Sequence, residues 1–243
     1  MKKNNKPLIV ITGASSGIGR ATALYFSEKG HPLLLVARRL QELKKLNLPN
    51  ASYAQVDVTD LNALRRAVAG AEDQYGPVSC MVNNAGAMFL GRIDQQNPVE
   101  WGQMLDVNVI GVLNGIKVVL NTMMHREKGT VINISSVVGK KAAANHAVYC
   151  ATKAAVNALT EVVREEAAKY NIRFINIMPG VVETNLLEST SDQNIKKDYR
   201  QWKKTLQLPL YAMDVAKIIG LCYEQPEHVC IRELIVAPTT QIP

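Results

Sequence analysis

The chain has 243 residues, of which 47% are hydrophobic and 20% are charged, so it suits a single globular domain, 1–243, with a full core. Its four cysteines form no CxxC pair, and no histidine stands at metal-ligand spacing from them. This pattern argues against a disulfide framework and a zinc site. It predicts reduced thiols in a cytoplasmic protein that holds no metal.

The net charge of +7 raises the question of a nucleic-acid partner. Basic residues are spread along the chain among acidic ones, however, and only 5% of the residues are aromatic. An anionic cofactor and substrate explain a mild positive bias equally well, so we expect no nucleic-acid partner. We also expect no membrane association, because no apolar run is judged to approach the ~20 residues of a membrane span.

Short apolar runs alternate with longer segments of helical periodicity. Runs rich in Val, Ile and Leu predict strands at 7–12, 33–37, 52–57, 79–83, 130–135, 172–178 and 232–236. Helical patterns lie near 17–29, 39–46, 60–75, 99–126, 147–169 and 213–223. This alternation implies right-handed crossovers between parallel strands. The sequence therefore predicts a doubly wound α/β fold with a seven-stranded parallel sheet flanked by helices.

The segment 185–212 is the exception to this alternation. It is polar, dense in lysine, and carries Tyr199 and Trp202 three residues apart. An insertion of this kind between the sixth strand and the last helix predicts a substrate lid that closes once a cofactor is bound. A short amphipathic surface helix with a solvated face is the alternative, and both can hold.

A glycine-rich turn joins the first predicted strand to the first predicted helix. It reads Gly13-Ala14-Ser15-Ser16-Gly17-Ile18-Gly19. Glycines let the backbone come close to a pyrophosphate, whose charge is stabilised by the helix N-terminus. The spacing differs from GxGxxG, so the strand–turn–helix context carries the prediction of a dinucleotide site.

The end of the second predicted strand indicates which dinucleotide. A carboxylate at this position would bind the ribose 2′-hydroxyl of NAD. This chain has Arg38 and Arg39 there and no acidic residue between 33 and 40. Because guanidinium binds phosphate through two parallel hydrogen bonds, the sequence favours NADP(H). An exposed basic strand end without a ligand is the alternative.

Two further strand ends are expected to contact the cofactor. Asp57 and Val58 close the third predicted strand and are expected beside the adenine. Asn83-Asn84-Ala85-Gly86 closes the fourth and supplies small residues where the backbone must approach a ligand.

Tyr149 and Lys153 lie four residues apart in a predicted helix, thirteen residues after Ser136. Residues i and i+4 share one face of a helix. An ammonium beside a phenol favours the phenolate, so we expect Lys153 to lower the pKa of Tyr149. A tyrosine tuned in this way can act as a general acid or base near neutral pH. The spacing alone is common, and its combination with the glycine turn makes the case.

Taken together in this order, the motifs of the chain resemble those of the short-chain dehydrogenase/reductase superfamily over essentially the full length. The matching residues are the turn 12–19, Asp57, Asn83-Asn84-Ala85-Gly86, Asn108, Ser135-Ser136, Tyr149-Cys150-Ala151-Thr152-Lys153 and Pro179-Gly180-Val181-Val182-Glu183-Thr184. The resemblance implies a single-domain Rossmann fold, usually a homodimer or homotetramer. It also implies hydride exchange between a nicotinamide and a small-molecule carbonyl or alcohol.

The resemblance further implies a catalytic tetrad of Asn108, Ser136, Tyr149 and Lys153. Tyr149 would protonate the carbonyl oxygen in reduction and deprotonate the alcohol in oxidation, while Ser136 hydrogen-bonds the same oxygen. Lys153 would lower the pKa of Tyr149 and hold the nicotinamide ribose. Asn108 would hold a water that links Lys153 to solvent, although an asparagine simply satisfied between helices is the alternative. The family spacing selects Ser136 over Ser135.

The residues expected at the cofactor and the substrate form two sets. Those at the cofactor are Gly13, Ser15, Ser16, Gly17, Ile18, Gly19, Arg38, Arg39, Asp57, Val58, Asn84, Ala85, Gly86, Tyr149, Lys153, Pro179, Gly180, Val182 and Thr184. Those framing the substrate are Met88, Phe89, Val137, Val138, Asn145, His146 and the lid.

Several functions stay open at this point. The end of the chain, 232–241, is similar to that of bacterial enzymes that oxidise serine and related 3-hydroxy acids, and basic lid residues would suit a carboxylate. Solvated surface charge explains those basic residues as well. A 3-oxoacyl carrier-protein reductase is a second enzymatic alternative. An NADP-binding redox sensor is the non-enzymatic one, and the complete tetrad argues against it.

Overall fold

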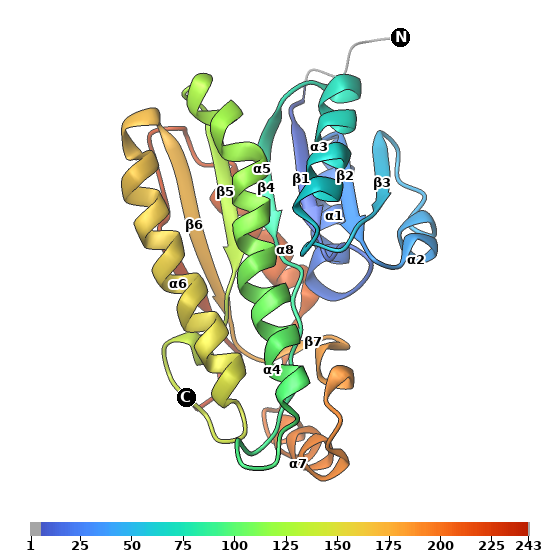
Figure 1. Ribbon diagram of the computed structural model, residues 1–243, viewed down its shortest axis with the longest axis vertical. Coiled ribbons are helices and arrows are strands. Elements are labelled where there is room, and N and C mark those ends of the chain that lie inside the picture. The colour runs from blue at the N-terminus through green and yellow to red at the C-terminus, as the bar shows by residue number, and fades with distance from the viewer. Residues whose placement is uncertain (1–5, 243) are drawn as a thin grey trace.

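A seven-stranded parallel sheet runs through the middle of the molecule (Figure 1). The computed structural model describes residues 6–242, and their strands follow the order β3-β2-β1-β4-β5-β6-β9. The strand bounds are β1 Leu8–Thr12, β2 Leu33–Ala37, β3 Ala51–Gln55, β4 Val78–Asn83, β5 Gly129–Ile134, β6 Ile172–Pro179 and β9 Glu233–Val236. The predicted doubly wound α/β fold and its seven-stranded sheet are confirmed.

Helices cover both faces of this sheet (Figure 1). Their bounds are α1 Gly17–Glu28, α2 Leu40–Lys44, α3 Leu61–Tyr75, α4 Pro98–Leu105, α5 Gly111–His125, α6 Ala147–Ala167, α7 Gln193–Lys204 and α8 Ala212–Tyr223. Helices α3, α5 and α6 pack on one face, and α1 and α8 pack on the other. Short 3-10 turns occupy Val137–Gly139, Ala168–Tyr170 and Leu186–Ser189.

The strands are apolar on both faces because each face is covered. In β1, Leu8 and Val10 pack into the core beneath α3, α5 and α6. Ile9 and Ile11 pack into the core beneath α1 and α8. Side chains alternate across a strand, so a buried parallel strand reads as a continuous apolar run, which is the pattern that located it in the sequence.

The helix predicted at 99–126 is divided by a π-helical turn at Asp106–Ile110, between α4 and α5. The turn coincides with Asn108, whose side chain is fully buried. Gly115, further along, allows α5 to lie against β4, since a Cβ there would fall 1.9 Å from Asn83 Oδ1. The π turn, of a kind often found at functional sites, has no signal in the apolar periodicity of the sequence.

The stretch Pro98–His125 is long and apolar enough, by length and composition, to cross a membrane. This finding corrects the expectation that no apolar stretch of the chain approaches such a length. Helices that pack on a sheet meet the same criterion, and Val112, Ile116, Val119 and Met123 of α5 lie in the core. The stretch therefore forms part of the α/β architecture.

The segment 185–212 forms a 3-10 turn and the helix α7, which lies beyond the end of the sheet with α4 (Figure 1). Asp192 caps α7 by accepting hydrogen bonds from the backbone N–H groups of Asn194 and Ile195 at 2.9 and 3.0 Å. A two-stranded parallel pair, β7 Val182–Glu183 with β8 Leu210–Tyr211, joins the two ends of the segment. The amphipathic helix and the insertion are thus both present.

Candidate active site

The expected site residues follow the carboxyl ends of the parallel strands, which meet at one edge of the sheet. The glycine turn follows β1, Arg38 and Arg39 follow β2, Asn84 follows β4, and Ser136 follows β5. The chain winds in opposite directions on either side of the β1–β4 pair. In open α/β sheets ligands bind at this reversal, outside the carboxyl ends of the strands.

The glycine turn is fixed to the end of β4 by direct hydrogen bonds. Thr12 Oγ1 accepts from the backbone N–H groups of Asn84 and Ala85, both at 3.0 Å. Asn84 Nδ2 donates to the Thr12 carbonyl at 2.9 Å. Gly13 has φ +66°, and a Cβ there would lie 2.8 Å from Ala85 Cα. Only glycine fits this close approach, and Gly86 continues the same segment.

The N-terminus of α1 lacks a side-chain cap and an acidic first turn. Ser16 is its N-cap residue but makes no side-chain cap hydrogen bond, and the first turn of α1 contains no acidic residue. Gly17, Ile18 and Gly19 form that first turn. Free N–H groups at a helix N-terminus stabilise phosphate. The residues present therefore fit the pyrophosphate of a dinucleotide.

The two arginines after β2 differ in position. Both side chains are exposed. Arg39 Nη2 donates to Ser15 Oγ at 3.1 Å and to Ser16 Oγ at 3.2 Å, so its guanidinium lies on the glycine turn. Arg39 is thus the arginine that the structure brings to the expected nucleotide site, together with two hydroxyl groups.

Asp57 and Val58 lie in the turn after β3. Asp57 Oδ1 accepts from the backbone N–H and the hydroxyl of Thr59 at 3.0 and 2.8 Å. Val58 is buried, and its carbonyl accepts from Asn114 Nδ2 at 2.9 Å. These contacts hold the turn at the same edge of the sheet as the glycine residues.

Tyr149 and Lys153 share one buried face of α6. Their side chains are 6% and 5% exposed, so both groups are withdrawn from bulk water. Lys153 Nζ donates to the Ile134 carbonyl at 2.8 Å and lies 5.7 Å from the centroid of the Tyr149 ring. Ser136 follows β5, and its Oγ lies 3.4 Å from the Pro179 carbonyl. The structure therefore brings together three of the four residues expected in the tetrad.

The prediction that Lys153 lowers the pKa of Tyr149 is wrong. Burial raises the pKa of Tyr149 well above its usual value, and the nearby Tyr199 raises it further, while the Ser136 hydroxyl opposes the rise. Burial also lowers the pKa of Lys153 to about 8. The physical reason is desolvation, which disfavours the charged form of each group, and the Lys153 ammonium bonds to a backbone carbonyl rather than to the phenol.

Asn108, the fourth expected residue, lies in the π turn and its side chain is satisfied. Its Oδ1 accepts from the Ala87 N–H at 2.8 Å, and its Nδ2 donates to the Ala87 carbonyl at 2.8 Å and to Thr152 Oγ1 at 3.1 Å. Thr152 directly precedes Lys153. Asn108 thereby fastens the chain after β4 to the helix that carries Tyr149 and Lys153.

The chain after β6 closes over the glycine turn. Gly180 N–H donates to the Val236 carbonyl at 2.7 Å, directly after the buried Pro179. Val182 lies in β7. A Cβ on Gly17 would fall 3.1 Å from Thr184 Cγ2. The segment 179–184 therefore spans from the sheet edge to the start of α1.

The residues expected around the substrate surround Tyr149. Met88, Phe89 and Val138 belong to the apolar cluster that contains it, with Leu187 and Tyr199 of the lid. The His146 ring centroid lies 6.5 Å from that of Tyr149 and 6.1 Å from that of Tyr199. Val137 begins the 3-10 turn after Ser136, and Asn145, at φ +63°, accepts from the Gly91 N–H at 2.9 Å.

Asn157 was not among the residues expected at the site. Asn157 lies one turn after Lys153, and its Oδ1 is 2.6 Å from Ser135 Oγ and 2.8 Å from Asn176 Nδ2. Its Nδ2 donates to the Gly139 carbonyl at 3.1 Å. The i+4 series Tyr149, Lys153, Asn157 was available in the sequence as a signal that this amide shares the buried face of α6.

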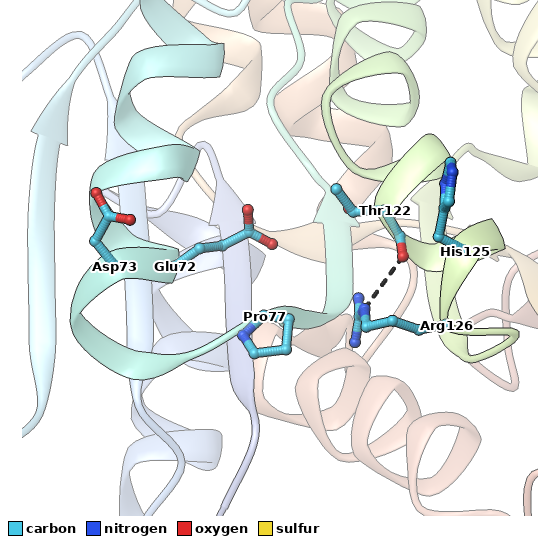
Figure 2. A pocket seen from close by; sticks show the side chains of 6 residues that line it. All are labelled: Glu72, Asp73, Pro77, Thr122, His125 and Arg126. Carbon is cyan, nitrogen blue, oxygen red and sulfur yellow. Dashed lines mark hydrogen bonds between the residues drawn. The ribbon is translucent and has the colours of Figure 1, made fainter.

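A surface depression elsewhere is unrelated to these residues. It is lined by Glu72, Asp73, Pro77, Thr122, His125 and Arg126, from the ends of α3 and α5 (Figure 2). Pro77 directly precedes β4, so the depression lies at the amino-terminal edge of the sheet. The strand ends that carry Ser136 and the glycine turn are at the opposite edge.

Comparison with known proteins agrees with this geometry. The family model described as short chain dehydrogenase matches residues 7–195. An uncharacterized oxidoreductase of Listeria monocytogenes is 40% identical over 242 residues, covering 96% of this chain and 97% of the relative. The chain therefore belongs to the short-chain dehydrogenase family and is an oxidoreductase.

Two solved structures share the fold over nearly the whole chain. The closed form of a serine dehydrogenase complexed with NADP⁺ is 29% identical, with a TM-score of 0.90 and coverage of 97% of this chain and 96% of the other. A serine dehydrogenase from Escherichia coli is 27% identical, with a TM-score of 0.83 and coverage of 97% and 100%.

Replacing Asn157 by alanine is expected to reduce the free energy of unfolding by about 2–3 kcal/mol, because it leaves Asn176 Nδ2 and the Gly139 carbonyl unpaired in a buried setting. Urea denaturation measures this change. Asn62→Ala, on the exposed face of α3, is the matched control and is expected to stay within about 0.5 kcal/mol of the parent protein. Equal losses in the two variants would contradict the role given to Asn157.

Proposed function

We propose that this short-chain dehydrogenase uses NADP(H) to interconvert a carbonyl and an alcohol of a small molecule, with Tyr149 as the acid–base group. The observation that carries the proposal is the shared location of two features. A tyrosine–lysine pair on α6 and an anion-accepting glycine turn with Arg39 lie at the same edge of the parallel sheet.

The bound nicotinamide supplies or accepts the hydride. The Tyr149 and Ser136 hydroxyls receive the substrate oxygen, since Ser136 follows β5 at the sheet edge and lowers the pKa of Tyr149. In reduction Tyr149 donates its proton to that oxygen, and in oxidation it takes the proton back. The raised pKa of Tyr149 keeps the phenol protonated, so the proton to be donated is present, although burial alone makes the group a weaker acid.

Lys153 contributes a positive charge next to this proton transfer. With its pKa lowered to about 8, Lys153 retains its ammonium at neutral pH and loses it as the pH rises through that value. The ammonium would hold the ribose hydroxyls of the cofactor. Asn108 holds the backbone next to Lys153 through Thr152.

The preference for NADP(H) over NAD(H) rests on Arg39. Its guanidinium, with Ser15 and Ser16, gathers hydrogen-bond donors where a 2′-phosphate would lie. Arg38 adds a second positive charge at the same corner. The similarity to a serine dehydrogenase complexed with NADP⁺ supports the same choice.

The segment 185–212 is proposed as the substrate lid. It is anchored at both ends, by the β7–β8 pair and by the hydrogen bond from Thr240 Oγ1 to the Leu206 carbonyl. Its middle reaches the site, where Tyr199 stacks edge-on with Trp202 and lies beside His146. Thr190 Oγ1 accepts from the Leu90 N–H at 3.1 Å, and both residues are buried. These contacts support a closed arrangement.

We also propose that the protein is a homo-oligomer in the cytoplasm. Large apolar side chains are exposed along one helical stretch and on α6, namely Val99, Leu105, Ile110, Leu113 and Val162. Such a surface supports association of copies, as a dimer or a tetramer. All four cysteines are free thiols, which supports a reducing compartment.

Arg39→Ala is expected to weaken NADP⁺ binding by about tenfold to a hundredfold and to leave NAD⁺ binding unchanged, because one charged phosphate contact is worth roughly 1.5–3 kcal/mol. Calorimetric titration of both cofactors measures the difference. Arg38→Ala is expected to have the smaller effect, and Arg65→Ala, on the exposed face of α3, none. Equal affinities of the parent protein for the two cofactors would refute the preference.

Tyr149→Phe removes only a hydroxyl, so NADP⁺ binding is expected to persist while turnover falls by about 100-fold or more. Steady-state kinetics with NADPH and a panel of ketones and aldehydes, alongside cofactor titration, tests this. Tyr199→Phe is the matched control, since that tyrosine packs near the site without meeting the reacting oxygen in this proposal. Full activity of the Tyr149 variant would assign the proton transfer to another group.

The lid is expected to gain protection from hydrogen exchange when NADP⁺ and a substrate analogue are added together, because closure completes the pocket. Exchange of the α7 amides, followed by mass spectrometry, is the measurement. The amides of α3 provide the internal reference and should not change. Full protection of α7 in the free protein would identify the segment as a fixed wall.

A further inference from the structure

The wall that faces the reacting tyrosine is apolar. Tyr149 belongs to a cluster with Met88, Leu90, Met104 and Leu187, all buried. Four half-buried residues pack against this cluster, namely Phe89, Val138, Leu186 and Tyr199. A charged group taken from water into such surroundings needs a partner, because its desolvation is costly.

The basic residues of the lid do not offer that partner, because three of the five are paired with acids. Arg200 Nη2 donates to both carboxylate oxygens of Glu188, at 2.6 and 2.8 Å. Lys196 is buried and lies 3.8 Å from the same carboxylate. Lys203 Nζ lies 2.6 Å from Glu183. The other two, Lys197 and Lys204, are exposed.

Lys153, beside Tyr149, already donates to the Ile134 carbonyl, and two further basic groups close to the wall are also occupied or uncharged. His146 Nδ1 donates to the Ala144 carbonyl at 2.6 Å, which leaves Nε2 as a hydrogen-bond acceptor. Burial lowers the pKa of His146, so its ring is uncharged at neutral pH. Lys140, just beyond the 3-10 turn that follows Ser136, is paired with Glu233 at 2.5 Å. A substrate carboxylate that bound Arg200, Lys203 or Lys140 would therefore have to displace an acid of the protein.

We propose that the site selects carbonyl compounds with apolar, uncharged substituents, such as alkyl or aryl ketones and 3-oxo esters, and rejects the corresponding carboxylates. The inference rests on the proposed function and deepens it by giving the substrate class. It separates this protein from the serine-like 3-hydroxy acid dehydrogenase that the end of its sequence resembles. Glu188 in the lid and Glu183 in β7, which hold Arg200, Lys196 and Lys203, are the determinants of that selection.

The test uses acetoacetate and its methyl ester, which carry the same ketone and differ in the carboxylate charge and one methyl group. NADPH consumed and alcohol formed are measured together for both compounds. The ester is expected to have a kcat/KM at least about tenfold above that of the acid, because the unpaired carboxylate must be desolvated against the wall. A preference for the acid would overturn the inference.

Binding gives a second readout that does not depend on turnover. With NADP⁺ present, neither ketone can react, and calorimetric titration reports their affinities directly. The ester is expected to bind at least about tenfold more tightly than the acid. If no carbonyl compound of a broad panel consumes NADPH, the proposed function fails. If ketones are reduced but acid and ester bind alike, the inference fails alone.

Glu188→Gln releases Arg200 and Lys196 from their shared partner. The ratio of acid to ester kcat/KM is expected to rise by about tenfold, since a free guanidinium can then bind the carboxylate. Glu227→Gln, which removes a distant partner of Lys128, is the matched control and should leave the ratio unchanged. Thermal unfolding of both variants shows that each is folded. An unchanged ratio in the Glu188 variant would overturn the assignment of selectivity to the lid.

Discussion

The buried ammonium of Lys153 sets the main constraint on this molecule. Its side chain is 5% exposed, and removing a charge from water costs several kcal/mol unless hydrogen bonds replace the lost hydration. The Ile134 carbonyl, at the end of β5, provides one such bond at 2.8 Å. Helix α6 must therefore hold one fixed position over β5. The same position determines where the Tyr149 hydroxyl lies relative to Ser136, and hence whether a substrate oxygen can reach both.

A network of amides inside the sheet holds that position. Asn83, Asn133 and Asn176 are neighbours in the register of β4, β5 and β6. Asn83 Nδ2 donates to Asn133 Oδ1 at 2.8 Å, Asn133 Nδ2 donates to Thr160 of α6 at 2.9 Å, and Asn176 Nδ2 donates to Asn157 of α6 at 2.8 Å. Among the described residues, the Oδ1 atoms of Asn83 and Asn176 have no hydrogen-bond partner. Buried polar atoms without a partner lower the stability of the fold. The three asparagines therefore fix the position of α6 on the sheet rather than add net stability.

The sequence predicted the structure well where a local feature requires a particular type of residue. Continuous apolar runs located the strands, and the glycines located the tight turn between β1 and α1, because few other residues permit those conformations. It was less informative where partners come from distant segments. No local pattern distinguishes Arg39, which reaches Ser15, from Arg38. The raised pKa of Tyr149 arises from burial against other elements, which a single helix pattern does not encode, and the apolar periodicity carries no signal for the π turn at Asn108.

The charge balance of the lid also depends on contacts between residues that are distant in the sequence. By composition alone, the lysines and Arg200 of 185–212 suit an acidic substrate, since each cation is a possible partner for a carboxylate. Folding brings Glu188 to Arg200 and Glu183 to Lys203, so these cations already have carboxylate partners. A substrate acid would exchange one ion pair for another and would still have to leave water, so its net gain is small. An uncharged ketone avoids that cost and gains by burying apolar surface against Met88 and Val138. In the proposed substrate selection, the positions of these two glutamates relative to α7 therefore matter more than the number of basic residues.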